Sequence, residues 1–235
     1  MGALHPAVMK RTLLTAVVAL TAVLHPLRAD PPPAPDKEKS KPLFDGKSLD
    51  GWEGDAKLWR VENGCLTGGN QKDQIKQNEF LATKAEYGNF ILRLKIKLSG
   101  TEGFINSGIQ IRSQRVPNNS EMAGYQCDFG DPGWWGCVYD ESRRNRVLAQ
   151  SDMKVLGPAI KRQDWNDYVI RAEGGRITTW INGVQGVDYT EADPKIVQTG
   201  KIGIQIHGGG KSQVEVKDIT IEELPATKAP DKKAG

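Results

Sequence analysis

Histidine is almost absent from this sequence, and its scarcity excludes several kinds of site. Two of the three histidines, His5 and His25, lie within the first 29 residues, so the rest of the chain contains His207 alone. A zinc site built on several histidines is therefore excluded, and the HExxH motif does not occur. The GxSxG elbow of serine hydrolases, the Walker loop and the GxGxxG motif are missing too. The sequence thus lacks the signatures of zinc peptidases, of such serine hydrolases and of nucleotide-binding enzymes.

No apolar run in the sequence is long enough to span a bilayer, and the clearest one lies at the N-terminus. Lys10 and Arg11 precede an apolar run from Leu13 to Leu24, and the small residue Ala29 follows. This layout is typical of a secretory signal peptide. We therefore expect residues 1–29 to be a signal peptide and the mature protein, which has no membrane span, to be periplasmic or secreted.

Net charge is also low once the predicted signal peptide is set aside. Residues 1–29 hold three basic residues and no acidic ones, so 29 Lys and Arg remain against 29 Asp and Glu. A balanced chain has no general attraction to nucleic acid. We expect no nucleic-acid partner.

Cysteine is scarce as well, and three is an odd number for an exported protein. Cys127 and Cys137 are symmetric about Pro132, so a hairpin that turns there would place them opposite each other. The sequence leaves open whether these two thiols form a disulfide. Neither they nor Cys65 have partners at metal-binding spacing, so no metal ligand is predicted.

Composition divides the rest of the chain into one domain between two polar ends. Residues 30–41 are rich in proline and charge and are predicted to form an extended linker. Residues 225–235 have the same character and are predicted to be a disordered tail. The 42–224 segment is long enough for one domain with a substantial core.

Period-two alternation indicates that this domain is almost entirely β. In "NFILRLKIKL" (89–98), apolar residues alternate with Arg93, Lys95 and Lys97. Several further segments alternate in the same way, and Asn-Gly, Gly-Gly and Asp-Pro-Gly turn signals separate them. Many short antiparallel strands predict a two-sheet sandwich of jelly-roll type.

Polar side chains gather on one face of three predicted strands. The pairs that alternate with core residues are Gln110 with Arg112, Gln126 with Asp128, and Gln205 with His207. An outer face in water is the ordinary alternative, but such faces favour Lys, Glu and Thr over amides. Planar amides and Arg hydrogen-bond sugar hydroxyls and carbonyls in pairs, and Trp134, Trp135 and Tyr139 offer stacking surface. We therefore predict a ligand groove.

The charged segment "DESRRN" (140–145) allows two interpretations. Its Arg residues either pair with Asp140 and Glu141 in water, or they place Arg143 or Arg144 at the groove rim against a sugar. The sequence does not choose between them.

A series of short motifs resembles the 3-keto-disaccharide hydrolase domain family. The motifs occur in family order across residues 42–224, and they are "LFDGKSLDGW", "WRVENGCLTG", "YGNFILRLKIKL", "NSGIQIRS", "GYQCDFG", "YDESRRN", "WNDYVI", "INGV" and "GKIGIQIHGG". The resemblance implies a concanavalin A-like, laminarinase-like β-sandwich that binds carbohydrate and cleaves 3-keto glycosides or disaccharides. It also implies an upstream oxidoreductase that makes the ketone. No cofactor is required by this chemistry, although sandwiches of this type often carry a structural calcium.

The arrangement of carboxylates argues against an ordinary glycosidase. Glycoside hydrolysis uses two carboxylates, whereas "YQCDFGD" has Gln126 where a laminarinase-type strand has one. Glu121, Asp140 or Glu141 would have to supply the second from elsewhere. A 3-keto sugar needs only one base, because the ketone acidifies the C2 proton and the C1 substituent leaves by elimination.

These arguments give a set of candidate residues. The predicted catalytic residues are Asp128, His207 and Arg112, and the predicted substrate-binding residues are Gln110, Gln126, Tyr139, Gln205, Trp135 and Arg143. Asp128 or His207 would act as the base or the acid, and Arg112 with Gln126 would stabilise the enolate. A non-catalytic, lectin-like module or an assembly domain on a tether remains the alternative.

Overall fold

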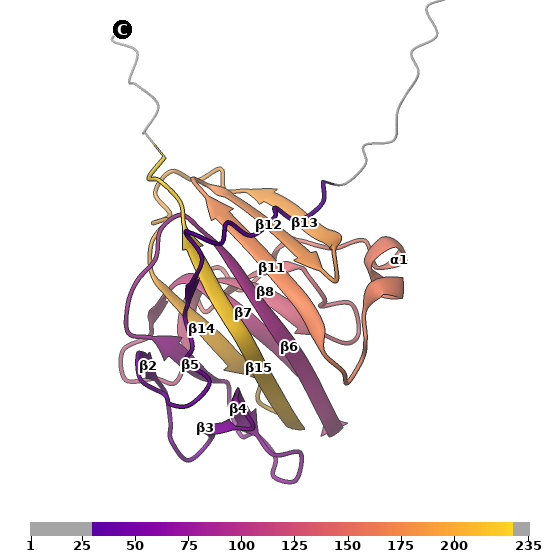
Figure 1. The fold of residues 1–235 in the computed structure, drawn as a ribbon. Coiled ribbons are helices and arrows are strands. Elements are labelled where there is room, and N and C mark those ends of the chain that lie inside the picture. Colours follow the sequence, from indigo (N-terminus) through magenta and orange to yellow (C-terminus); the bar gives the residue numbers. More distant parts are fainter. Residues whose placement is uncertain (1–29, 228–235) are drawn as a thin grey trace, which may run out of the picture.

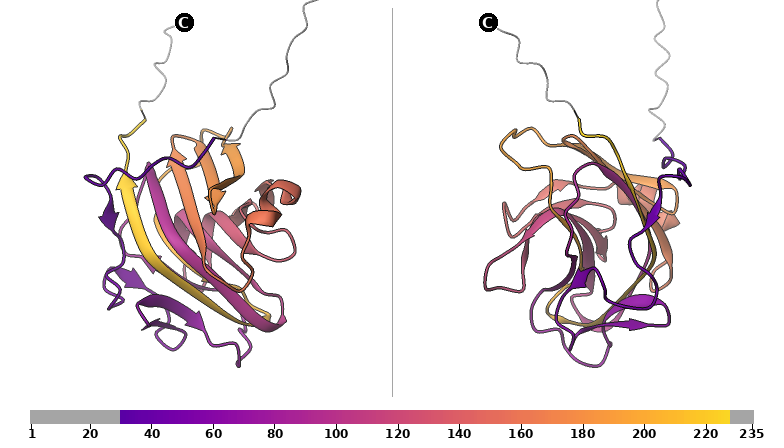
Figure 2. Two further views of the ribbon diagram at one scale, coloured as in Figure 1. Left: turned by 45° about the vertical axis from the view of Figure 1, so that its right-hand side comes forward. Right: turned by 60° about the vertical axis from the view of Figure 1, so that its left-hand side comes forward.

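Two antiparallel sheets packed face to face make up the protein (Figures 1 and 2). The computed structural model describes residues 30–227, so the predicted signal peptide and residues 228–235 of the predicted tail lie outside the described residues. The architecture confirms the predicted two-sheet sandwich.

The large sheet contains eight of the strands found in residues 30–227, and β6 and β15 form its long central pair. In spatial order it consists of β13 (Val184–Thr190), β12 (Arg176–Ile181), β11 (Asn166–Glu173), β6 (Phe90–Gly103), β15 (Gly210–Glu223), β4 (Cys65–Gly69) and β3 (Trp59–Glu62), with β1 (Lys41–Pro42) paired to β15.

The small sheet contains the other seven strands of the described chain. In spatial order it consists of β10 (Val147–Ala149), β9 (Val138–Glu141), β8 (Met122–Gly130), β7 (Asn106–Arg115), β14 (Lys201–Ile206), β5 (Glu79–Thr83) and β2 (Trp52–Glu53). The connection after β10 holds a short helix α1 (Met153–Leu156) and a 3-10 turn (Gly157–Ala159), which the sequence patterns did not predict.

Alternation along the strands explains the core between the sheets. In β6, Phe90, Leu92, Leu94 and Ile96 are buried, while the intervening basic residues are half-buried. The apolar residues of β7, β8 and β14 are buried from the other side. Each sheet therefore turns one apolar face inward, as a sandwich requires, and the opposite face of the small sheet is free to carry polar residues.

The segment predicted to be a linker, residues 30–41, runs against the large sheet (Figure 1) and includes a turn at residues 37–39. The Arg93 guanidinium donates to the carbonyl oxygens of Pro33 and Ala34, both at 3.1 Å. The Trp180 indole donates to the Asp30 carbonyl at 2.7 Å. The segment is thus held at Asp30, Pro33 and Ala34 before β1 pairs with β15.

The β8–β9 hairpin fixes the positions of two thiols. Its register pairs Cys127 with Val138, one residue away from the symmetric arrangement that the sequence suggested. All three cysteines are free and buried. Cys127 packs in the core, whereas the Cys137 thiol lies 3.7 Å from a carboxylate oxygen of Asp128. The disulfide that the sequence left open is not formed here.

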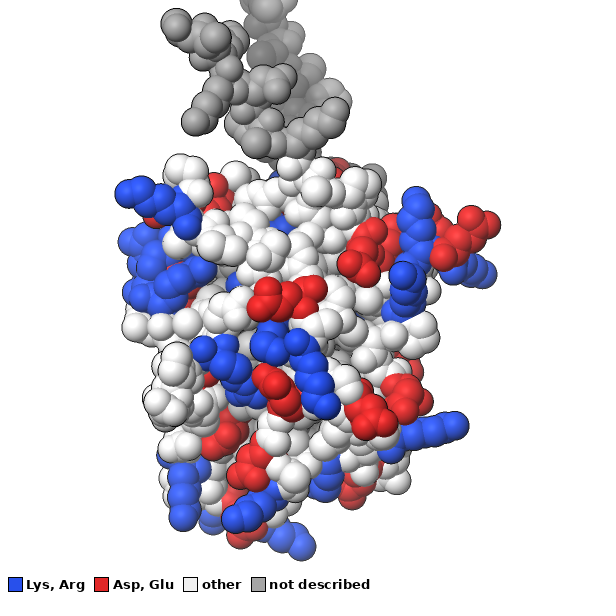
Figure 3. All heavy atoms as spheres, turned by 90° about the vertical axis from the view of Figure 1, so that its left-hand side faces the viewer, with Lys and Arg blue, Asp and Glu red and all other residues white. Residues whose placement is uncertain are grey.

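The surface has mixed charge. On the face shown in Figure 3, positive and negative side chains are interspersed. Within residues 30–227, no helix is both long enough and apolar enough to cross a membrane.

Candidate active site

A small pocket of about 130 Å³ lies on the outward face of the small sheet. Residues of β7, β8 and β9 form it together with residues just before β7 and just after β14. We call it the candidate pocket, and its lining residues are Phe104, Asn106, Gln126, Asp128, Trp134, Tyr139, Glu141 and His207. Four predicted site residues therefore meet in it, namely Gln126, Asp128, Tyr139 and His207.

Three buried glutamines form a directed chain of hydrogen bonds beneath the pocket, which we call the amide chain. The Gln110 side-chain amide donates to Gln126 Oε1 at 2.8 Å, and the Gln126 amide donates to Gln205 Oε1 at 3.2 Å. Each of these three side chains is at most 2% exposed. This face is therefore not in water, and the amide geometry is fixed, because every oxygen in the chain already accepts a hydrogen bond.

The amide chain ends on two carboxyl groups. The Gln126 amide also donates to Asp128 Oδ1 at 2.6 Å, and the Gln205 amide donates to Glu141 Oε2 at 3.3 Å. At the far end, the Ser113 hydroxyl donates to Gln110 Oε1 at 2.5 Å. The donors along this path thus succeed one another from Ser113 to the two carboxyl groups, and Asp128 and Glu141 accept the last bonds.

Gly108 makes room for this arrangement. It pairs with Asp128 across β7 and β8, on the face that carries Gln126. A methyl group on Gly108 would lie 2.4 Å from the Gln126 side chain and 2.7 Å from Asp128 Oδ1. Only a residue without a side chain allows both groups to occupy these positions.

The two carboxyl groups of the pocket have raised pKa values. Burial raises the pKa of Asp128 well above its usual range, and the charge of Glu141 adds to the effect. Burial, followed by the charge of Glu121, raises the pKa of Glu141 to about 7. Desolvation disfavours the charged form of each acid, so the pocket favours the protonated form of Asp128, and Glu141 titrates near neutrality.

Two polar side chains of the pocket have a nitrogen atom that makes no hydrogen bond with the described residues. Asn106 is 3% exposed, and its Nδ2 donates no hydrogen bond. His207 Nδ1 lies 2.6 Å from the Gly208 carbonyl oxygen. Because a carbonyl only accepts, Nδ1 carries a proton there, and Nε2 is the ring nitrogen left for other partners. An unpaired buried amide is costly in free energy, so Asn106 indicates an absent hydrogen-bond partner.

Aromatic rings form the wall of the pocket. Trp134 stands edge-on to Tyr139 and to Phe104, with ring centroids 6.1 Å and 6.4 Å apart. Phe104 in turn packs at 4.7 Å from the His207 ring. Such rings provide an apolar surface of the kind on which sugar rings stack, beside the polar floor made by Asn106 and the carboxyl groups.

The sequence matches one protein family over most of its length. A profile of the 3-keto-alpha-glucoside-1,2-lyase-like domain matches residues 39–222. The chain belongs to this family. Membership confirms the resemblance drawn from the motifs and links the lyase-like domain to carbohydrate chemistry. No curated protein sequence matches the chain.

Solved structures share the fold of this lyase-like domain. A Parabacteroides distasonis ATCC 8503 protein, provisionally named as a glycosyl hydrolase, superposes with a TM-score of 0.63 at 23% identity, covering 83% of this chain and 100% of that one. The VIP36 exoplasmic/lumenal domain, bound to Ca²⁺ and Man3GlcNAc, gives 0.55 at 13%, covering 84% and 93%. A Bacillus subtilis protein of galectin-like fold gives 0.53 at 10%, covering 76% and 92%. At these identities the likeness concerns the fold, and it agrees with the predicted concanavalin A-like sandwich.

Arg112, a predicted catalytic residue, lies away from the candidate pocket of the lyase-like domain. The β7–β8 register shifts between Ile111 and Gln114, and Arg112 has a φ of 51° within that irregularity. Its guanidinium donates to the Gly88 and Gly174 carbonyls at 2.7 and 2.6 Å. Side-chain oxygens of Asn89 and Gln198 accept its remaining bonds. Burial lowers the pKa of Arg112 to about 10. The residue ties four segments together and does not face Asp128.

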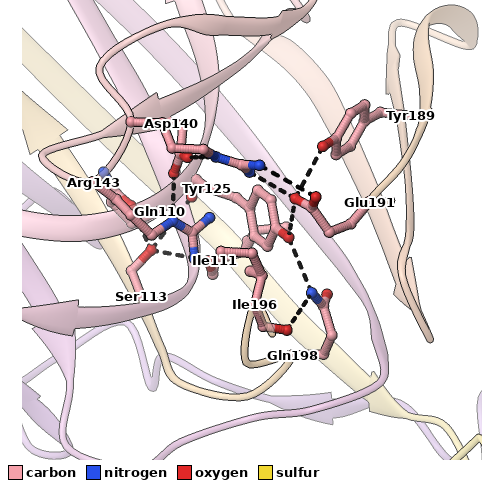
Figure 4. Close-up of polar contacts among 11 residues, drawn as sticks. Gln110, Ile111, Ser113, Tyr125, Asp140, Arg143, Tyr189, Glu191, Ile196 and Gln198 are labelled. Atoms are coloured by element: carbon pink, nitrogen blue, oxygen red, sulfur yellow. Dashed lines mark hydrogen bonds and ion pairs between the residues drawn. The ribbon is translucent and has the colours of Figure 1, made fainter. Parts of the chain in front are cut away.

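Arg143, a predicted substrate-binding residue, is also bound within the protein (Figure 4). Its guanidinium pairs with the buried Asp140 at 2.7 Å and stacks 4.5 Å from the Tyr125 ring centroid. Arg144 pairs with Asp140 as well and reaches Glu191 at 2.6 Å. This cluster favours neither of the two interpretations of "DESRRN", because the Arg residues are not in water and do not line the pocket.

Three other predicted substrate-binding residues occupy positions next to the pocket. Gln110 and Gln205 do not line it but hold Gln126 and Glu141 through the amide chain. Trp135 is 2% exposed, packs against Phe129 and lines a neighbouring hollow. Its neighbour Trp134 supplies the ring of the candidate pocket instead.

Alternation also contains the signal for two residues that were not among the predicted site residues. Glu141 follows Tyr139 by two positions in β9, and Asn106 precedes Gly108 and Gln110 by two and four in β7. Extending the same-face argument by one step would have found both.

The described chain offers little for a metal ion. In residues 30–227, no group of three or more His, Cys, Asp or Glu side chains is placed to hold one. The structural calcium stays a prediction.

Proposed function

We propose that this protein cleaves 3-keto glycosides by elimination across C1 and C2. A base removes the C2 proton, and the electron pair of that C–H bond forms an enolate with the C3 carbonyl. The C3 ketone then re-forms as the C1–C2 double bond forms and the C1–O bond breaks. The aglycone leaves with the bonding pair and takes up a proton. Addition of water across the double bond would release the 3-keto sugar and complete a hydrolysis.

Glu141 is the base in this proposal. A general base works best when its pKa lies near the pH of the reaction, and that of Glu141 lies at about 7. Its carboxylate is held by the Gln205 amide at 3.3 Å and lines the pocket. This single observation, a near-neutral carboxyl group fixed at the end of a buried amide chain, carries the proposal.

Asn106 and Asp128 are the groups that stabilise the enolate. The Asn106 amide N–H has no partner among the described residues. Burial raises the pKa of Asp128, and in this proposal its carboxyl group is protonated and donates. Fixed donors aimed at a developing oxyanion are among the largest contributions to catalysis. A neutral carboxylic acid in an apolar site can serve as such a donor. This role replaces the one that the sequence suggested for Arg112.

Tyr139 and His207 are the pocket residues that assist the departing oxygen in this proposal. Burial raises the pKa of Tyr139, so its hydroxyl stays protonated at neutral pH and can donate to the leaving group. His207 lines the same pocket and binds the sugar or the leaving oxygen through Nε2. The expected setting is the periplasm or the cell exterior, with an oxidoreductase upstream that forms the ketone.

The presence of two carboxyl groups also supports a second candidate, ordinary glycoside hydrolysis. Glu141 supplies the second carboxyl group that "YQCDFGD" lacks. Glycosidases keep one carboxyl group ionised beside a protonated one. The two raised pKa values in this pocket fit that division of roles as well, so the substrate comparison below decides between the two reactions.

One substrate comparison tests the proposal. Purified protein is offered a 3-keto glucoside and its unoxidised parent, and aglycone release is measured. We expect release from the keto form only, and a large loss of rate in Glu141→Gln. Cleavage of the parent would support the glycosidase, and binding of both sugars without turnover would support a lectin-like module.

A further inference from the structure

An apolar hollow of about 390 Å³ lies beside the candidate pocket. It is formed by the end of β6, the segment leading into β7 and the turn after β8. Its apolar side chains are Leu98, Phe104, Ile105, Pro132 and Trp135. We call it the apolar hollow, and its volume is about three times that of the candidate pocket.

Phe104 joins the two cavities. It lines both of them. It is also one of the few large apolar side chains of the described chain that remain exposed, with an exposed fraction of 36%. The two cavities therefore adjoin at this ring, an arrangement that suits a molecule with one part on either side of it. A glycoside has this two-part shape, with a sugar ring on one side of the C1 oxygen and an aglycone on the other.

The chemistry of the hollow differs from that of the candidate pocket. Leu98, Ile105 and Trp135 offer carbon surface, and the Trp135 N–H is already donated to Asp131 at 3.3 Å. At the rim, Arg162 and Asp131 pair with each other at 2.9 Å, and the exposed Gln163 is the other polar side chain of the lining. A second sugar would bring hydroxyl groups that need hydrogen-bond partners, and burying them unpaired is costly. An aromatic ring would meet no such cost.

We propose that the apolar hollow binds the aglycone, and that the preferred substrates are 3-keto glycosides of aromatic alcohols rather than of sugars. This inference rests on the proposed function. Placing the aryl group against Phe104 and Pro132 leaves the 3-keto ring among Asn106, Asp128 and Glu141. The phenolate that leaves is also a weaker base than an alkoxide and depends less on a proton donor.

The test blocks the hollow without touching the candidate pocket. Arg162→Trp adds bulk at its exposed rim, and Lys161→Trp adds the same bulk at an exposed neighbour that does not line it. The substrates are 3-keto phenyl glucoside and 3-keto methyl glucoside, compared by kcat/KM. We expect Arg162→Trp to lower the value for the phenyl substrate roughly tenfold and to leave the methyl substrate unchanged, while Lys161→Trp changes neither.

Equal effects of Arg162→Trp on both substrates would overturn the aglycone site, and so would a wild-type preference for a 3-keto disaccharide over the phenyl substrate. A second measurement separates a failure of the aglycone site from a failure of the proposed reaction. It compares the binding of unoxidised phenyl and methyl glucosides by calorimetry. Tighter binding of the phenyl glucoside, lost in Arg162→Trp, would support the hollow even if no 3-keto substrate were cleaved. Equal binding of the two glucosides would contradict it.

Discussion

Glu141 can act as a base only when it is ionised, and its environment sets the pH at which this happens. Its pKa of about 7 predicts that kcat/KM rises through neutral pH and is lost as the pH falls below it. The charge of Glu121 is the second cause of the raised value. In a plot of kcat/KM against pH, Glu121→Gln should therefore move the rise on the acidic side (the acidic limb) to lower pH. The plateau value at higher pH should change little. A limb that stays in place in this variant would mean that another group is the base.

Arg112 is a structural residue, and a substitution distinguishes this role from a catalytic one. Its guanidinium makes four hydrogen bonds to neutral acceptors in a buried position. Arg112→Lys keeps the charge but cannot reproduce this set of bonds. We expect a loss of about 2–4 kcal/mol in the free energy of unfolding, measured by urea denaturation, with kcat per folded molecule unchanged. A lower kcat at full stability would restore the catalytic assignment.

Strand alternation predicted much of this site, and its failure at Arg112 has a definite cause. A period of two assigns side chains to the two faces of a sheet only where the pairing between strands is regular. Gln110, Gln126 and Gln205 lie in regular stretches, and their side chains meet in the amide chain, although only Gln126 lines the pocket. Arg112 lies in a register shift, which turns its side chain elsewhere, and no local pattern in "IQIRSQ" marks the irregularity. The sequence patterns also did not show which strands lie side by side, because that depends on the order β9-β8-β7-β14 in the folded sheet.

At the scale of elements, the turn between β9 and β10 holds the strand that carries Glu141. The backbone of Asp140 bonds with Asn145 and Arg146 across this turn, and its side chain is fully buried. Arg144 links Asp140 to Glu191. Figure 4 labels these two acidic residues, and Glu191 lies on the connection after β13. The position of Glu141 in the pocket thus depends on an ion-pair cluster outside it.

Arg144→Gln should therefore impair catalysis without touching substrate. It leaves Glu191 without its charged partner and Asp140 with Arg143 alone. We expect kcat/KM to fall roughly tenfold to a hundredfold, since small displacements of a catalytic group are costly, while the pH of the acidic limb stays near that of the wild type. Arg143→Gln is the matched control, because Arg143 lacks the link to Glu191, and its effect should be smaller. Equal losses would show that the link is not what holds β9.

For the whole molecule, the candidate site has a cost in stability that depends on pH. Asp128 and Glu141 both have raised pKa values in the folded state. A carboxyl group of this kind binds its proton more tightly in the folded chain than in the unfolded one. Its stabilising contribution to the free energy of unfolding is therefore complete below the pKa of the unfolded chain, near 4. That contribution is lost as the pH rises through the pKa of the folded chain.

The free energy of unfolding should accordingly fall between pH 5 and pH 8, in contrast to the behaviour of ion-paired acids. Glu141→Gln removes one of the two groups and should reduce this fall by roughly 1–2 kcal/mol, after allowance for its partial exposure to solvent. Asp128→Asn should reduce it further, since the amide oxygen can still accept from Gln126. Urea denaturation of each variant at both pH values gives the slope, and Glu38→Gln, which changes an exposed carboxylate, is the control. If the slope of Glu141→Gln matches that of the wild type, the carboxyl group is not held in a desolvated pocket, and its assignment as the base loses its physical ground.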